Sequence, residues 1–112
     1  MLKLNTVKHD LATIIEIEGD VDFYSSPEVR KAIIQLTEAQ TPVILINLSK
    51  VGYMDSSGVA TLVEGLQKVG KYGGQFKLTN LRNEVKGVFE LSRLDKVFKI
   101  YDTIEEALNT LN

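Results

Sequence analysis

Near the middle of the chain, residues 43–48 form an almost unbroken apolar run that is rich in β-branched side chains. A strand with one face in water alternates apolar and polar residues, whereas this run contains almost no polar residue. It therefore predicts a central strand that is covered on both faces. Segments with helical spacing stand on either side of it, and this alternation favours an α/β fold with parallel strand pairs.

Two amphipathic helices are predicted around this strand. The first has a start signal in which Ser26 caps the helix, Pro27 takes the first helical position, and Ser25 with Glu28 has capping-box spacing one residue earlier. The apolar faces of the two helices recur at intervals of three and four residues: Val29, Ala32, Ile33 and Leu36 in the first, and Val59, Leu62, Val63, Leu66 and Val69 in the second. Each such stripe is expected to pack on the sheet.

The chain opens with two candidate strands, over residues 2–7 and 11–18, that alternate apolar and polar positions. His9 and Asp10 lie between them as a short polar turn. A pair of this kind predicts a hairpin, in which neighbouring strands run antiparallel. The sheet is therefore expected to be mixed.

The second half of the chain continues the alternation. Short strands are predicted over residues 75–79 and 97–101, a third helix around residues 85–89, and a last helix capped by Asp102. The full order is β-β-α-β-α-β-α-β-α, a mixed sheet with about four helices packed on it. No linker or repeat interrupts the pattern, so we expect one domain over residues 1–112.

Composition narrows the function classes. The 112 residues carry a net charge of −2, with scattered Lys and Arg and no Cys. Scattered basic residues argue against direct nucleic-acid binding, and the lack of Cys excludes disulfides and thiolate metal sites. The longest apolar run is far shorter than the roughly 20 residues that span a bilayer, and the N-terminal segment lacks the apolar stretch of a signal peptide. We therefore expect a cytoplasmic protein that does not interact with a membrane.

The segment over residues 53–58, Tyr-Met-Asp-Ser-Ser-Gly, is not explained by packing alone. It lies between the central strand and the second helix, where α/β proteins gather ligand and partner sites. The free N–H groups of the helix start favour an anion there. A purely structural interpretation is helix capping, but one cap needs one side chain, and Asp55, Ser56 and Ser57 compete for it. The surplus hydroxyls are expected to face solvent or a partner.

Four segments in register resemble one known family. Residues 19–27, Gly-Asp-Val-Asp-Phe-Tyr-Ser-Ser-Pro, resemble the segment before the first helix in anti-sigma-factor antagonists of the STAS domain family, and residues 53–58 resemble their phosphorylation loop. The pair Gly73-Gly74 and the segment 91–98 match later landmarks of that family. The resemblance covers essentially the whole chain.

The resemblance implies a switch protein and not an enzyme. In that family the loop serine is phosphorylated by a partner that is both an anti-sigma factor and a serine kinase, and a serine phosphatase removes the phosphate. The unphosphorylated form binds the partner and so frees a sigma factor. By position the phosphoacceptor is Ser56, with Ser57 as its rival. The residues expected to contact the partner are Asp22, Phe23, Tyr24, Asp55, Ser56, Ser57 and Gly58. No cofactor is expected on this chain, since the partner kinase would bind Mg-ATP.

One position departs from the family pattern, because the loop usually continues Gly-Leu-Gly and here Gly58 is followed by Val59 and Ala60. This leaves open a second function, in which the chain is a scaffold or stressosome-like signalling subunit with a different partner. For Phe23 and Tyr24, a core role for one of the pair is the alternative to partner contact.

Other chemistries are weakly supported. A serine hydrolase would need a base beside Ser56, but the sequence around it lacks the first glycine of G-x-S-x-G, and the only histidine, His9, lies in the hairpin turn. Asp20, Asp22 and Asp55 are carboxylates of the kind that bind Mg²⁺, although the first two are more simply read as holding the turn before the first helix. The glycines form neither a G-x-G-x-x-G motif nor a P-loop.

Overall fold

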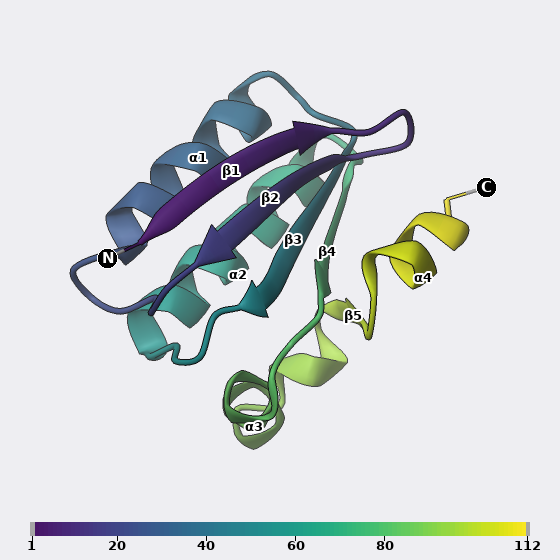
Figure 1. The fold of residues 1–112 in the computed structure, drawn as a ribbon. Helices are drawn as coiled ribbons and strands as arrows, with labels where there is room; N and C mark the ends of the chain where they lie inside the picture. Colours follow the sequence, from purple (N-terminus) through teal and green to yellow (C-terminus); the bar gives the residue numbers. More distant parts are fainter. Residues whose placement is uncertain (1, 112) are drawn as a thin grey trace.

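The computed structural model describes residues 2–111, which form a five-stranded sheet in the order β1-β2-β3-β4-β5 (Figure 1). The strands are β1 (Lys3–Lys8), β2 (Thr13–Glu18), β3 (Val43–Lys50), β4 (Gln75–Thr79) and β5 (Lys99–Tyr101). β1 pairs antiparallel with β2, and every other neighbouring pair is parallel. The predicted mixed sheet with its N-terminal hairpin is therefore confirmed.

The helices cover both faces of this sheet. They are α1 (Ser26–Glu38), α2 (Ser56–Lys71), α3 (Asn83–Leu91) and α4 (Ile104–Asn109), with one short 3₁₀ turn, η1 (Leu94–Lys96). Figure 1 shows α1 and α2 side by side on one face, with α4 on the other. The predicted element order is confirmed, with η1 as the one addition. None of the helices within residues 2–111 has the length and apolarity that crossing a membrane requires.

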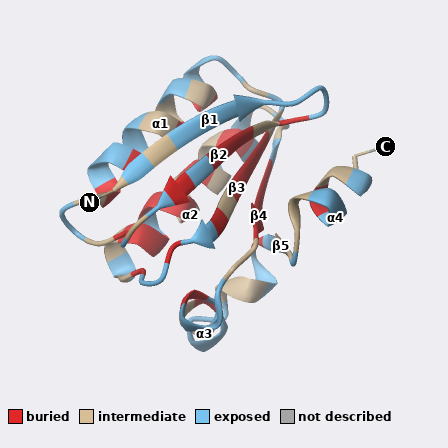
Figure 2. Cartoon of the chain, viewed as in Figure 1, coloured by how far each residue is buried: buried red, intermediate tan, exposed pale blue. Residues whose placement is uncertain are grey.

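Strand β3 is the centre of the molecule, as its sequence predicts (Figure 2). Ile44, Ile46 and Leu48 point into the main core with the apolar faces of α1 and α2, and all three are fully buried. Leu45 points to the other face and packs with Ala107 of α4. The two sets of side chains on β3 therefore belong to separate cores on opposite faces of the sheet.

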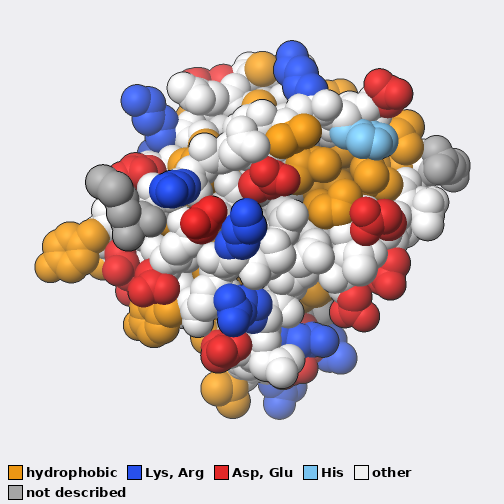
Figure 3. Space-filling model, viewed as in Figure 1, with side chains coloured by type: hydrophobic (Ala, Val, Ile, Leu, Met, Phe, Trp, Pro, Cys, Tyr) orange, Lys and Arg blue, Asp and Glu red, His pale blue; other side chains and the backbone are white. Residues whose placement is uncertain are grey.

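The second core, under α4, is smaller and partly open. Figure 3 shows hydrophobic side chains gathered on this face beside the single histidine. Lys77 of β4 is buried there, and its Nζ donates to Thr110 Oγ1 at 3.0 Å and lies 5.2 Å from the ring centre of Tyr101. The ammonium therefore has a polar partner and an aromatic face in place of water.

Several element boundaries differ from the prediction: β1 is shifted by one residue to Lys3–Lys8, β3 continues to Lys50, and three further differences have a clear local cause. β2 begins at Thr13 and not at residue 11, because the turn closes through hydrogen bonds between His9 and Ala12. β5 begins at Lys99 and not at residue 97, because the N–H groups of Val97 and Phe98 still donate to the Leu94 carbonyl of η1. The helix α4 is capped by Thr103, whose Oγ1 accepts from the Glu106 N–H at 3.1 Å, so the predicted cap at Asp102 is wrong by one residue.

Candidate functional site

The start of α2 is capped by the residue before the two serines. Asp55 has an extended backbone, and its Oδ1 accepts hydrogen bonds from the N–H groups of Ser57 at 2.9 Å and Gly58 at 3.3 Å. Two of the free N–H groups at the helix start are thereby satisfied. Ser56 is the first helical residue and is exposed. Of the three candidate caps, Asp55 takes the role and leaves the Ser56 hydroxyl at the surface.

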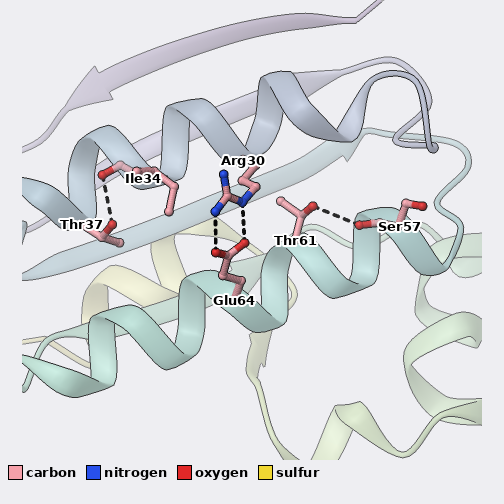
Figure 4. Close-up of polar contacts among 6 residues, drawn as sticks. All are labelled: Arg30, Ile34, Thr37, Ser57, Thr61 and Glu64. Carbon is pink, nitrogen blue, oxygen red and sulfur yellow. Dashed lines mark hydrogen bonds and ion pairs between the residues drawn. The ribbon is translucent and has the colours of Figure 1, made fainter.

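Ser57 is held more tightly than its neighbour. Its N–H is bound by Asp55, and its carbonyl oxygen accepts from Thr61 Oγ1 at 3.0 Å (Figure 4). Its side chain is only half-buried, whereas both serines were predicted to be exposed. The structure therefore distinguishes the two hydroxyls, and Ser56 is the more accessible.

A second loop lies against this one. An isolated parallel bridge joins Val21 to Met54, with the Val21 N–H donating to the Tyr53 carbonyl at 3.0 Å and the Asp55 N–H donating to the Val21 carbonyl at 3.2 Å. Val21 and Met54 are both buried. The bridge brings together two segments that are about thirty residues apart in the sequence. The local pattern of apolar and polar residues does not predict it.

Asp22 organises the turn that follows this bridge. Its Oδ1 accepts from the N–H groups of Tyr24 and Ser25, each at 2.9 Å, and the Ser25 hydroxyl donates to the Asp20 carbonyl at 2.7 Å. The hydrogen bond from the Ser25 backbone is the main cause that lowers the pKa of Asp22. The predicted role of Asp22 in holding this turn is confirmed.

The same turn corrects the prediction for the start of α1. Ser26 was expected to be its cap, but it is the first residue of the helix and is buried. The cap position is Ser25, which makes no side-chain cap hydrogen bond to α1 because its Oγ accepts from the Asp22 N–H at 2.9 Å instead. The Ser26 N–H donates to the Asp22 carbonyl at 2.8 Å, so the loop backbone takes over part of the capping.

Aromatic side chains project from both loops. Phe23 is 70% exposed and Tyr24 is 87% exposed, and their rings meet edge to face with centroids 5.6 Å apart. Neither is a core residue, so the alternative of a core role is wrong, and contact with a partner stays a prediction. Tyr53, from the neighbouring loop, is 53% exposed and was not predicted as a contact residue. Its place in the 53–58 motif was the sequence feature that could have indicated it as a contact residue.

Gly58 has a different role from the one predicted. It was expected to contact the partner, but it is buried beneath the bridge and packs on Val21 and Met54. The remaining predicted residues, from Asp22 to Tyr24 and from Asp55 to Ser57, do lie on the two joined loops.

Within residues 2–111, no histidine or other base is hydrogen-bonded to the Ser56 hydroxyl. His9 lies in the β1–β2 turn, where its Nδ1 accepts from the Leu11 N–H, at the end of the sheet opposite to the Ser56 loop.

Arg30 of α1 forms a two-point ion pair with Glu64 of α2, with N–O distances of 2.7 and 2.8 Å (Figure 4). Among the described residues, no group of three His, Cys, Asp or Glu side chains is arranged to hold a metal ion.

Comparison with known proteins agrees with the fold. The model of the STAS domain matches residues 3–107. An anti-sigma-B factor antagonist of Bacillus subtilis (strain 168) is 35% identical over 86 residues, which are 77% of this chain and 78% of that protein.

Solved structures show the same architecture. An anti-sigma factor antagonist from Mycobacterium paratuberculosis superposes with a TM-score of 0.91 at 26% identity, over 99% of this chain and 94% of that chain. The Bacillus cell fate determinant SpoIIAA in its phosphorylated form shares the fold with a TM-score of 0.75 at 22% identity, over 100% of both chains.

Proposed function

Because the chain belongs to the STAS domain family, we propose that it is an anti-sigma-factor antagonist gated by phosphorylation of Ser56. The unphosphorylated protein binds an anti-sigma factor that is also a serine kinase, and this binding frees a sigma factor. The kinase then transfers phosphate to Ser56, and a serine phosphatase restores the hydroxyl. The protein works in the cytoplasm, without contact to nucleic acid.

The observation that carries this proposal is the position of Ser56. It is exposed at the first position of α2, next to Asp55, on a loop that the Val21–Met54 bridge joins to the loop carrying Asp22 and the two exposed aromatic rings. A kinase must reach a hydroxyl from solvent, and in the part of the chain that the structure describes no base is hydrogen-bonded to this hydroxyl to make it a nucleophile in its own right. The geometry therefore supports a substrate for phosphorylation and not a catalyst.

The partner supplies the chemistry in this scheme. Phosphoryl transfer needs Mg-ATP and a group to orient the accepting hydroxyl, which the kinase would provide. The antagonist contributes the acceptor and a surface that positions it. It needs no cofactor of its own.

Phosphorylation changes the surface that the partner meets. A phosphoserine adds about −1.5 to −2 charges at neutral pH, next to Asp55 and one loop away from Asp22. Like charges across an interface cost several kcal/mol, and each 1.4 kcal/mol is about tenfold in affinity. The partner surface that accepts a hydroxyl among carboxylates would therefore reject the phosphate, and the complex would dissociate.

The test uses the kinase-type anti-sigma factor encoded in the same genome. After incubation with Mg-ATP, mass spectrometry should find a single phosphate on Ser56, and calorimetry should show at least tenfold weaker binding of the phosphorylated protein. Equal affinities of the two forms would contradict the switch. If no kinase-type anti-sigma factor binds at all, the scaffold or signalling-subunit function takes its place.

A further inference from the structure

The start of α2 already carries an anion before any phosphate arrives. The Asp55 carboxylate occupies the N–H groups of Ser57 and Gly58. The proposed phosphoacceptor is the very next residue, Ser56. A phosphate on Ser56 would therefore bring a second anion to the same two donors.

The charges of the two joined loops strengthen this competition between the Asp55 carboxylate and a phosphate on Ser56. Residues 19–29 and 51–61 contain no Lys or Arg. They carry four carboxylates: Asp20, Asp22, Glu28 and Asp55. Neither segment thus offers a cation to the phosphate, and the positive groups that they present at Ser56 are the backbone N–H donors of the helix start.

A phosphate dianion is the stronger competitor for these donors. It has more charge than a carboxylate and three acceptor oxygens, and a phosphoserine at the first helical position is tethered beside the N–H groups of the next two residues. Asp55 is half-buried, so its side chain has a route to solvent. The Ser57 backbone is held independently through the Thr61 hydroxyl, so the helix need not unwind when the carboxylate leaves.

We propose that phosphorylation exchanges the cap of α2: the phosphate on Ser56 takes the N–H groups of Ser57 and Gly58, and the Asp55 carboxylate turns outward. This inference rests on the proposed phosphorylation of Ser56. It makes Asp55 a positioning residue with two states, inward in the hydroxyl form and outward in the phosphorylated form. The partner then meets a surface changed at two neighbouring residues, while α2 remains capped and folded in both states.

The direct test is a pH titration of backbone amide resonances. The protein is prepared with phosphoserine incorporated at position 56 during translation, so that no kinase is needed. The amide proton shifts of Ser57 and Gly58 should then follow the second ionisation of the phosphate, about pH 6, in step with its ³¹P signal. If these two amides respond only in the acid range where carboxylates titrate, Asp55 has kept the cap and the proposal is overturned.

A stability comparison gives a second readout. In the wild-type protein one cap replaces another, so phosphorylation should shift the melting temperature by less than about 2 °C. In Asp55→Ala the phosphate fills an empty cap, and phosphorylation should raise the melting temperature by about 4 °C or more. Asp20→Ala is the matched control, because it removes a loop carboxylate that does not cap α2, and it should behave as wild type.

The outcomes separate this inference from the proposed function. Equal melting shifts in the wild type and Asp55→Ala would overturn the cap exchange. A cognate kinase that leaves Ser56 unmodified would sink the proposed function but would not affect either measurement, since the phosphoserine is incorporated without it.

Discussion

Gly58 of α2 lies in direct contact with the backbone of Val21 in the neighbouring loop. A Cβ placed on Gly58 would be 2.8 Å from Val21 Cγ1, 2.9 Å from the Val21 carbonyl oxygen and 2.7 Å from Met54 Cγ. Real Cβ atoms do not approach other atoms so closely. The absence of a side chain at position 58 therefore allows the two loops of the site to meet.

The first prediction follows from this contact. Gly58→Ala gains roughly 0.8–1 kcal/mol of helix propensity but must displace the Val21 backbone, and overpacking of this kind costs about 1–3 kcal/mol. We expect net destabilisation in urea unfolding, together with shifted amide resonances in the loop around Val21. Gly70→Ala, in the last turn of the same helix, meets nothing within 4 Å and should stabilise by about 0.4–1 kcal/mol. Equal effects of the two changes would show that the loops do not depend on the contact.

A second prediction concerns acid stability. The hydrogen bond from Arg30 is the main cause that lowers the pKa of Glu64 below its ordinary value of 4.5. A carboxyl group with a lowered folded pKa stabilises the protein above its unfolded pKa, and this contribution disappears as the pH falls through the folded value. Glu64→Gln should therefore be less stable than wild type at pH 7, and the difference should close below about pH 4.

The control for this ion pair is a double-mutant cycle. In an Arg30→Met background, Glu64→Gln should no longer show the pH-dependent difference, because the partner charge is gone. Melting temperatures between pH 3 and pH 7 provide the measurement. A difference between wild type and Glu64→Gln that persists unchanged at pH 3 would mean that the pair is not its cause.

The elements of the fold could be predicted because each has a local signal. The β-branched run over residues 43–48 and the stripes of α1 and α2 are periodic patterns that the structure confirms. The errors in the predicted helix starts occur where two neighbouring residues have the same preference for the cap position. Ser25 and Ser26 are equally good caps by type, and the position of the helix start was decided by the turn at Asp22, which binds the Ser25 N–H and hydroxyl and the Ser26 N–H.

The site was predicted less completely, for a physical reason. The residues of the two loops could be identified from the sequence motifs over residues 19–27 and 53–58. The bridge between Val21 and Met54, however, is a contact between distant segments and has no local sequence signature. The same is true of the role of Gly58, which depends on what lies above it. Whether Phe23 and Tyr24 are exposed was likewise decided by the turn that Asp22 builds.

A third prediction concerns these aromatic rings. Exposed aromatic side chains beside a partner site commonly supply much of the binding energy. Phe23→Ala and Tyr24→Ala should each weaken binding to the kinase-type partner by about tenfold or more, since the loss of an anchor costs over 1 kcal/mol. Leu91→Ala in α3 is the matched control, because Leu91 is 90% exposed and lies on neither loop of the site. Unchanged affinity in Phe23→Ala and Tyr24→Ala would place the partner elsewhere, and an equal loss in Leu91→Ala would show that the effect is not specific to the two loops.

The last prediction separates the two serines. Ser56 is exposed, whereas Ser57 is half-buried with its N–H bound by Asp55 and its carbonyl oxygen bound by Thr61. A kinase that must draw the acceptor into its own site should reach Ser56 without disturbing α2, but would have to loosen the first turn of the helix to use Ser57. We therefore expect Ser57→Ala to be phosphorylated at close to the wild-type rate, and Ser56→Ala not to be phosphorylated.

The binding of the same variants completes this test. Ser56→Ala removes only a hydroxyl and should keep partner affinity within a few-fold. Ser56→Asp places a carboxylate at the first helical position, where negative charge is tolerated or slightly stabilising, so it should fold normally. It should nevertheless bind at least tenfold more weakly, because its charge faces the partner beside Asp22 and Asp55. Phosphate found on Ser57 by mass spectrometry would move the acceptor by one residue and leave the switch in place, whereas full affinity of Ser56→Asp would show that charge at this position does not control binding.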